Sequence, residues 1–325
     1  MEENVFQTRM DLSRLTQHVS VIRQEIGKVI VGQEEMIDQL ITAILADGHV
    51  LIEGVPGVAK TLTAKLLSKA VSVDFSRIQF TPDLMPSDVL GTSVFNLKTS
   101  EFEFKAGPIF SNIVLIDEIN RAPAKTQSAL FEVMEERQVT IDGNTYQMKS
   151  PYLVVATQNP IEHEGTYRLP EAQLDRFLFK IVVNYPNAEQ EQDILLRHHS
   201  RQGALPVLEV NSVLSAQEIA AFRAHAQKVH IETKLLQYIT NIIQETRNNP
   251  MLFLGASPRA SLAILNSAKA YAALNGRDFV SPEDIKFVAL PVLRHRILLS
   301  PEKEMEGVST DEVVKQIIDK VEVPR

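Results

Sequence analysis

The stretch His49–Thr61, HVLIEGVPGVAKT, predicts a strand, a glycine-rich loop and the start of a helix in immediate succession. The apolar run HVLIE is typical of a buried strand, and Leu62, Leu66 and Leu67 recur at helical spacing after the loop. A loop in this position directs consecutive backbone N–H groups, together with the positive end of the helix dipole, into one concavity. The stretch therefore predicts a site for a polyphosphate.

The loop itself, GVPGVAKT, follows the pattern G-x-x-x-x-G-K-S/T except that Ala59 replaces the last glycine. The pattern directs the Lys60 ammonium to the β- and γ-phosphates of a nucleotide and the Thr61 hydroxyl to Mg²⁺. Because a side chain disfavours positive φ, we expect Ala59 to keep a negative φ or the loop to shift slightly. The predicted phosphate cradle comprises Gly54, Val55, Pro56, Gly57, Val58, Ala59, Lys60, Thr61 and Leu62.

Apolar runs and helical patterns alternate over the first two hundred residues, as in parallel strands joined by crossover helices. Two stretches, 92–104 and 138–148, alternate as hairpins do, and Asp142-Gly143 in the second favours a tight turn. The prediction is an α/β domain with a five-stranded parallel sheet between helices and two hairpin insertions. The five predicted strands are 49–53, 75–80, 112–117, 152–157 and 179–184.

The strand signal ends after Ala188, and the rest of the chain is helical in pattern. Residues 202–214 contain Gly and Pro and are predicted to be a linker. From Ser215 onward apolar residues recur at helical spacing, as Leu235, Ile239 and Ile242 do on one face. The predicted domains are therefore an α/β nucleotide-binding domain over 1–201 and a small all-helical domain with a helical tail over 215–325.

A second polar cluster follows the third predicted strand, where NIVLIDE ends in Asp117 and Glu118. Ligands bind beyond the carboxyl ends of parallel strands, so both carboxylates are expected beside the phosphate loop. There Asp117 would hold Mg²⁺ through its water shell, and Glu118 would orient or deprotonate the attacking water. Alone, the pair would fit a helix cap equally well, but the neighbouring loop favours the metal and water roles.

The composition excludes several classes of function. The 325 residues contain no cysteine, which excludes disulfides, cysteine-bound zinc and thiol nucleophiles. The 33 basic and 41 acidic side chains leave a net charge of −8 without a visible basic stripe, so nucleic acid is not an expected partner. The chain has neither a run of about eighteen apolar residues nor a basic start before an apolar block, so we expect no membrane span and a cytoplasmic protein.

The series GVPGVAKT, NIVLIDEINRAPAKTQ, ATQNP, LPEAQLDRF and GASPRA resembles, in content and order, the MoxR branch of the AAA+ ATPases. The matching motifs extend from about Ile30 to Ala260, and the helical tail fits as well. Ala-Lys-Thr is common in this branch at the end of the phosphate loop, which accounts for Ala59. The resemblance implies Mg²⁺-dependent ATP hydrolysis by a homo-oligomeric ring, taken to be hexameric. It also implies chaperone-like remodelling or maturation of a partner, often one with a von Willebrand A domain.

The resemblance assigns roles to individual residues as well. Asn159 in ATQNP resembles sensor 1, which helps to position the lytic water. Arg176 in LDRF resembles the arginine finger, which acts on the neighbouring subunit's ATP, and Arg168 is a rival for that role. With Lys60 and Glu118, Asn159 and Arg176 form the predicted catalytic set.

Further expectations concern the base, the γ-phosphate and the hairpins. Arg259 in GASPRA resembles sensor 2, which reaches from the helical domain to the γ-phosphate in its own subunit. Gly32 and Gln33, in the segment IVGQ, resemble the residues that pack on the base. The hairpins resemble loops that face a ring pore or a client, where the aromatic side chains would make contacts. These aromatic side chains are Phe95, Phe102 and Phe104, although aromatic residues in a hairpin are more often simply packed.

Three alternatives remain open. The first is a magnesium-chelatase-like AAA+ subunit, which only detailed motifs distinguish. The second is a DNA-directed AAA+ helicase or loader, against which the acidic balance argues. The third is a nucleotide-gated adaptor without hydrolysis, against which the complete predicted catalytic set argues.

Overall fold

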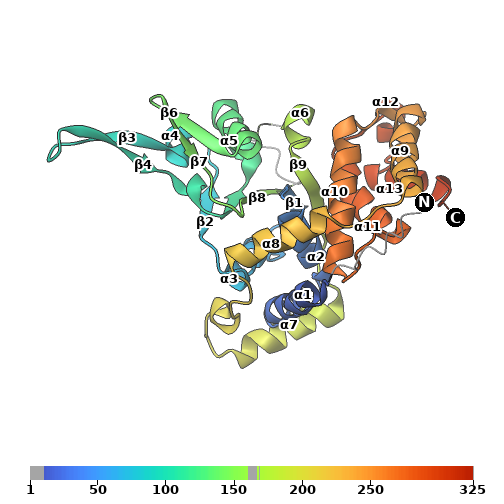
Figure 1. Cartoon of the computed structure of the whole chain (residues 1–325), viewed down its shortest axis with the longest axis horizontal. Helices are drawn as coiled ribbons and strands as arrows, with labels where there is room; N and C mark the ends of the chain where they lie inside the picture. The colour runs from blue at the N-terminus through green and yellow to red at the C-terminus, as the bar shows by residue number, and fades with distance from the viewer. Residues whose placement is uncertain (1–10, 160–166, 168, 325) are drawn as a thin grey trace, which may run out of the picture.

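The computed structural model describes residues 11–159, 167 and 169–324 (Figure 1). A central sheet has the strand order β2-β5-β8-β1-β9, and all its neighbouring strands are parallel. The predicted α/β fold with a five-stranded parallel sheet is therefore confirmed, and every predicted strand overlaps an observed one. The strands are β1 (His49–Gly54), β2 (Phe75–Gln79), β5 (Ile113–Asp117), β8 (Leu153–Gln158) and β9 (Phe177–Val183).

Both faces of the sheet are covered, which is why its strands read as continuous apolar runs. Val50 and Ile52 belong to a core shared with α1 (Ser13–Gly27), α2 (Glu34–Leu45) and α3 (Lys60–Ala70). Leu51, pointing the other way, belongs to a second core with α4 (Pro86–Leu90) and α5 (Ala124–Glu136). Successive side chains of β1 therefore point alternately into the two hydrophobic cores.

The two predicted hairpins are present. One is β3 (Gly91–Asn96) with β4 (Glu101–Ala106), which projects from the body of the molecule (Figure 1). The other is β6 (Gln138–Ile141) with β7 (Asn144–Gln147), where Asp142 and Gly143 have φ of 51° and 79°. Two consecutive positive φ angles are what a type I′ turn requires, so the Asp-Gly pair sets this turn.

The aromatic side chains of the first hairpin have different surroundings. Phe104 stacks on Tyr146 of the second hairpin, with ring centroids 4.2 Å apart. Phe95 and Phe102 pair edge to face at 5.2 Å and are 45% and 73% exposed. Packing therefore explains Phe104, whereas Phe95 and Phe102 present apolar surface to solvent.

The C-terminal part of the chain is helical apart from one short antiparallel pair, β10 (Leu252–Leu254) with β11 (Leu298–Leu299). The prediction of helices alone missed this pair, because runs of two or three residues carry no readable periodicity. The predicted linker contains a short 3₁₀ helix, η3 (Pro206–Glu209). The helices are α7 (Ala188–Ser200), α8 (Ala216–Gln227), α9 (Thr233–Asn248), α10 (Pro258–Leu274), α11 (Pro282–Leu293), α12 (Pro301–Met305) and α13 (Thr310–Lys320).

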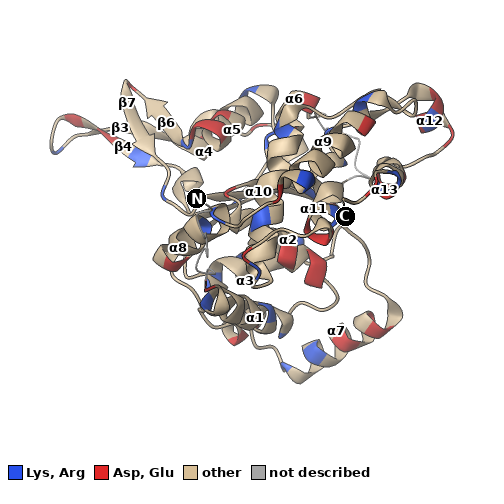
Figure 2. Ribbon diagram, turned by 45° about the vertical axis from the view of Figure 1, so that its right-hand side comes forward, with Lys and Arg blue, Asp and Glu red and all other residues tan. Residues whose placement is uncertain are grey.

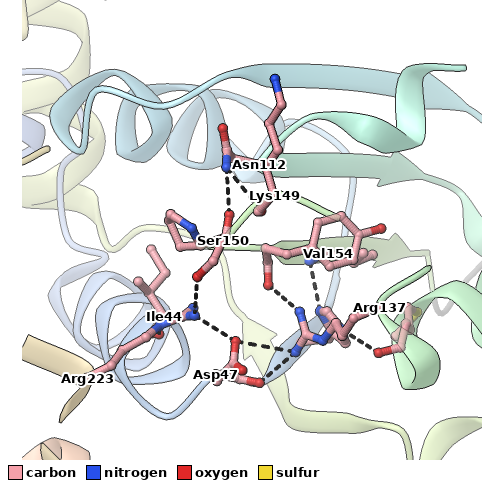
Figure 3. Close-up of polar contacts among 12 residues, drawn as sticks. Ile44, Asp47, Asn112, Arg137, Lys149, Ser150, Val154 and Arg223 are labelled. Atoms are coloured by element: carbon pink, nitrogen blue, oxygen red, sulfur yellow. Dashed lines mark hydrogen bonds and ion pairs between the residues drawn. The ribbon is translucent and has the colours of Figure 1, made fainter. Parts of the chain in front are cut away.

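Helix α8 is tied to the edge of the sheet at which the strands begin, called here the N-terminal edge (Figure 3). The Arg223 guanidinium donates to the carbonyl oxygen of Ile44 at 2.6 Å and pairs with Asp47 at 2.8 Å. Arg137, which follows α5, also donates to the backbone of Asp47, at 2.8 Å. One aspartate in the turn before β1 thus joins α8 and the end of α5.

Charged residues of both signs are mixed along the described chain (Figure 2). Helix α7, for example, carries Glu189, Glu191 and Asp193 together with Arg197. None of the helices in the described ranges is both long enough and apolar enough to span a membrane.

Candidate nucleotide site

The predicted phosphate loop lies between β1 and α3, at the edge where the strands end, called here the C-terminal edge. Helix α3 begins at Lys60, directly after Ala59, and the Lys60 ammonium donates to the carbonyl oxygen of Gly54. This bond joins the two ends of the loop. Gly57 has a φ of +88° with open space on its Cβ side, so the loop interior has room for a ligand.

The first alternative expected for the backbone of Ala59, a negative φ, was wrong. Its φ is 60° and its ψ 19°, which is the left-handed region that costs a residue with a side chain about 1–2 kcal/mol. The residue lies between the loop and the first turn of α3, where the chain reverses direction within a few residues. The surrounding structure therefore imposes a glycine-like conformation on an alanine.

Thr61 and Asp117 lie next to each other, as predicted. The Thr61 hydroxyl is 3.4 and 3.5 Å from the two carboxylate oxygens of Asp117. Asp117 is buried and also accepts from the Thr157 hydroxyl at 3.1 Å and from Arg77 Nε at 2.6 Å. A hydroxyl and a carboxylate side by side are the hard oxygen donors that Mg²⁺ prefers, so the residues present fit that ion.

Glu118 directly follows β5 and has a φ of 58°, a second left-handed residue at this edge. Its carboxylate accepts from Gln79 Nε2 at 2.9 Å and pairs with Arg121 at 2.8 Å. Its backbone N–H donates to the Thr157 hydroxyl at 3.1 Å. The side chain is therefore held in a defined position next to Asp117, as a group that orients water must be.

Sequence reasoning missed the residues around these two carboxylates. The register of β2 with β5 sets Gln79 opposite Asp117, so the pairing of the strands is the signal that would have found Gln79 and Arg77. Asn159 directly follows β8, which lies between β5 and β1, and is 8% exposed. It therefore lies at the same edge as the phosphate loop. Arg168 lies outside the described residues.

A cavity of about 240 Å³ adjoins the phosphate loop. Gln33 lines it as predicted, whereas Gly32 does not; a Cβ on Gly32 would meet the Gln190 side chain. The wall joins residues from three distant segments, of which only the part around α7 was not predicted. It includes Ile30 and Val31 before α2, Val58, Ala59 and Leu62 at the loop, and the unpredicted Pro186, Ile194 and His198 around α7. An apolar cavity beside a phosphate loop suits a planar heterocycle.

Arg176 lies at the opposite edge of the sheet. It precedes β9, whose first residue, Phe177, pairs with His49 at the start of β1. Its guanidinium contacts Glu135 of α5 at 3.1 Å. An arginine at the N-terminal edge is far from the phosphate loop of its own chain, and this arrangement agrees with a role in a neighbouring subunit.

Arg259 was expected to reach the phosphate in its own subunit, and the structure does not agree. Arg259, in the first turn of α10, contacts the other oxygen of Glu135 at 3.2 Å. One carboxylate thus bridges Arg176 and Arg259 at the N-terminal edge. The reason is the seating of the helical domain, because α10 packs against α2 and α8 and brings its first turn to the edge opposite the phosphate loop.

Comparisons with known proteins agree with this architecture. The model of the ATPase family associated with various cellular activities (AAA) matches residues 49–179, and that of the AAA lid domain matches residues 244–317. The uncharacterized YeaC protein of Bacillus subtilis is 47% identical over 301 residues, which cover 93% of each chain. A solved structure from Cytophaga hutchinsonii superposes with a TM-score of 0.89 at 44% identity, covering 97% of both chains.

A further relative carries a name that agrees with the motifs. The chaperone MoxR1 of Mycobacterium tuberculosis is 45% identical over 317 residues, covering 93% of this chain and 81% of that protein. The strand order, the phosphate loop, the acidic pair and the helical lid are all present in the described structure. The chain therefore belongs to the MoxR family of AAA+ ATPases.

Proposed function

We propose that this protein hydrolyses ATP with Mg²⁺ as a ring of identical subunits and uses the energy to remodel or mature a partner protein. The observation that carries the proposal is the meeting of Thr61 and Asp117, 3.4 Å apart, at the end of the phosphate loop. With a triphosphate in that loop, Thr61 and Asp117 would hold its Mg²⁺. Bound Mg²⁺ would neutralise charge on the phosphoryl oxygens.

The residues of the chain then have separate roles. Lys60 and the loop amides hold the phosphates, and the apolar cavity beside Val58 and Leu62 holds the base. Glu118, held by Gln79 and Arg121, orients the attacking water and takes its proton, and Asn159 helps to position that water. Together these groups bind ATP and prepare its γ-phosphate for attack, while the nearby guanidinium groups of Arg77 and Arg121 pair with Asp117 and Glu118.

The guanidinium that acts on the γ-phosphate would come from a second subunit. Arg176 and Arg259 share Glu135 at the N-terminal edge, so both are available to a nucleotide bound at the C-terminal edge of a neighbour. An arginine finger contributes roughly 10³ to 10⁵ in rate. Hydrolysis would therefore require assembly, and a ring satisfies that requirement for every subunit at once.

The remodelling role rests on the name of a relative, the chaperone MoxR1 of Mycobacterium tuberculosis. The exposed Phe95 and Phe102 on the projecting β3–β4 hairpin would supply apolar contacts to the client. We also propose that the client protein contains a von Willebrand A domain and that the remodelling takes place in the cytoplasm.

The test measures ATP binding and turnover by the purified protein. We expect the rate per subunit to rise with protein concentration, and Glu118→Gln to lower kcat by roughly 10²- to 10⁴-fold while ATP still binds. Glu302→Gln, a charge-matched control on α12, should leave both unchanged. A rate per subunit independent of concentration, or full turnover by Glu118→Gln, would contradict the proposal.

A further inference from the structure

Arg296, in the lid, is buried against the segment that carries Arg176. Its side chain is 4% exposed, and all five of its N–H groups have acceptors. Nε donates to a carboxylate oxygen of Asp175 at 2.6 Å, and the two Nη atoms donate to four backbone carbonyl oxygens. These belong to Asp175 at 3.0 Å, Phe177 at 2.6 Å, Leu178 at 3.1 Å and Val292 at 2.7 Å.

Most of the acceptors flank Arg176 in the sequence. The acceptors Asp175, Phe177 and Leu178 lie immediately before and after it, and all belong to the N-terminal edge of the sheet. His295 adds a further bond, from Nε2 to the carbonyl oxygen of Phe177 at 3.0 Å. The lid therefore holds the backbone on both sides of Arg176 through two consecutive side chains.

The side chain of Arg176 has fewer restraints than its backbone. It donates to the carbonyl oxygen of Phe131 at 3.2 Å and pairs with Glu135 at 3.1 Å, and it is 30% exposed. Arg176, Arg259 and Arg296 all line one cavity of about 300 Å³, together with Asp175 and Glu135. Three guanidinium groups thus share two carboxylates. The orientation of the Arg176 side chain depends on the backbone position that Arg296 fixes.

We infer that Arg296 is a positioning residue for Arg176, and that through it the lid sets where the guanidinium stands on the face offered to the next subunit. The inference rests on the proposed trans action of Arg176. Arg296 itself is buried, and all five of its N–H groups donate to protein acceptors. Its contribution to hydrolysis passes entirely through the placement of Arg176.

Arg296→Lys is the informative variant. Lysine keeps the charge, but its compact ammonium has three donors and cannot reach acceptors spread around a planar guanidinium. Because a displacement of about 1 Å can lower a rate by roughly 10²-fold, we expect kcat to fall by that order. The KM for ATP should change little, since other residues of a different subunit hold the nucleotide.

A double-variant cycle separates positioning from a general loss of structure. Turnover is measured for the wild type, Arg296→Lys, Arg176→Ala and the combined variant, each with its melting temperature and assembly state. The combined variant should have the kcat of Arg176→Ala alone, because Arg296 acts only through that side chain. The matched control is Arg277→Lys, which disturbs a lid pair with the buried carboxylate of Asp284, at 2.5 Å, without touching the Arg176 segment.

Each outcome decides the inference. Turnover of Arg296→Lys equal to that of the wild type overturns it, as does a combined variant with a further loss multiplied onto that of Arg176→Ala. A fall in kcat of the same size in Arg277→Lys also overturns it, because general weakening of the lid would then suffice. If the wild type is active but Arg176→Ala is too, the trans role in the proposed function fails first, and the positioning role fails with it.

Discussion

At the scale of single residues, two residues of the candidate nucleotide site have a strained backbone. Ala59 and Glu118 have φ of 60° and 58°, although neither is glycine. A residue in this region costs of order 1–3 kcal/mol, and it persists only where the surrounding structure imposes it. The left-handed conformation of Ala59 lets helix α3 begin directly after the phosphate loop. The left-handed conformation of Glu118 places its carboxylate beside Asp117.

The strain at Ala59 can be measured by removing its side chain. Ala59→Gly should raise the free energy of unfolding by about 0.5–1 kcal/mol, because glycine adopts this φ without a clash. Ala221→Gly, at an exposed position within α8, should have the opposite sign and lower it by about 1 kcal/mol. Urea denaturation of both variants tests the pair, and a loss of stability in Ala59→Gly would contradict the strain.

At the scale of elements, helix α8 makes two kinds of polar contact. Arg223 is 11% exposed and reaches the sheet through Ile44 and Asp47. At the other side of the helix, Glu218 pairs with Arg14 of α1, which is 71% exposed. Buried hydrogen bonds of a charged group contribute much more than an exposed ion pair, which solvent and salt screen.

Two variants compare these contacts directly. Arg223→Met should lower the free energy of unfolding by about 1–3 kcal/mol, because it removes the hydrogen bond of a charged group to the carbonyl oxygen of Ile44 and the ion pair with Asp47. Arg14→Met should change it by at most about 1 kcal/mol. Both values come from urea denaturation, and equal effects of the two variants would show that burial of Arg223 is not what matters.

At the scale of the whole molecule, two buried histidines connect separate parts of the fold. His49 accepts from the N–H of Val154 at 3.0 Å through Nδ1 and donates to the carbonyl oxygen of Met134 at 3.1 Å through Nε2. His295 joins the lid to Phe177. Burial lowers the pKa of both well below the usual value, and the charges of Arg137 near His49 and of Arg296 near His295 act in the same direction.

Stability should therefore fall as the pH is lowered from about 6.5 towards 5. The unfolded chain binds a proton at each histidine in this range, and the folded chain, with its lowered pKa, does not. Each histidine contributes a slope of up to about 1.4 kcal/mol per pH unit. His49→Gln, which can keep both hydrogen bonds without titrating, should remove one such contribution from denaturation curves, and an unchanged slope would contradict the assignment.

The features that could be predicted from the sequence are those encoded by neighbouring residues. The phosphate loop follows from one stretch between a strand and a helix, and the β6–β7 turn follows from Asp142 and Gly143. The five strands were predicted because both faces of the sheet are buried, which makes each strand a continuous apolar run. In each of these cases the sequence pattern that carries the prediction lies within a few consecutive residues.

Contacts between distant segments became visible only in the folded molecule. Gln79 reaches Glu118 because β2 pairs with β5, and the cavity beside the phosphate loop exists because α7 packs near Ile30. Arg259 lies at the edge opposite the phosphate loop because of the way the lid is seated on the sheet. No local pattern encodes the orientation of one domain on another, since it depends on how whole surfaces fit together.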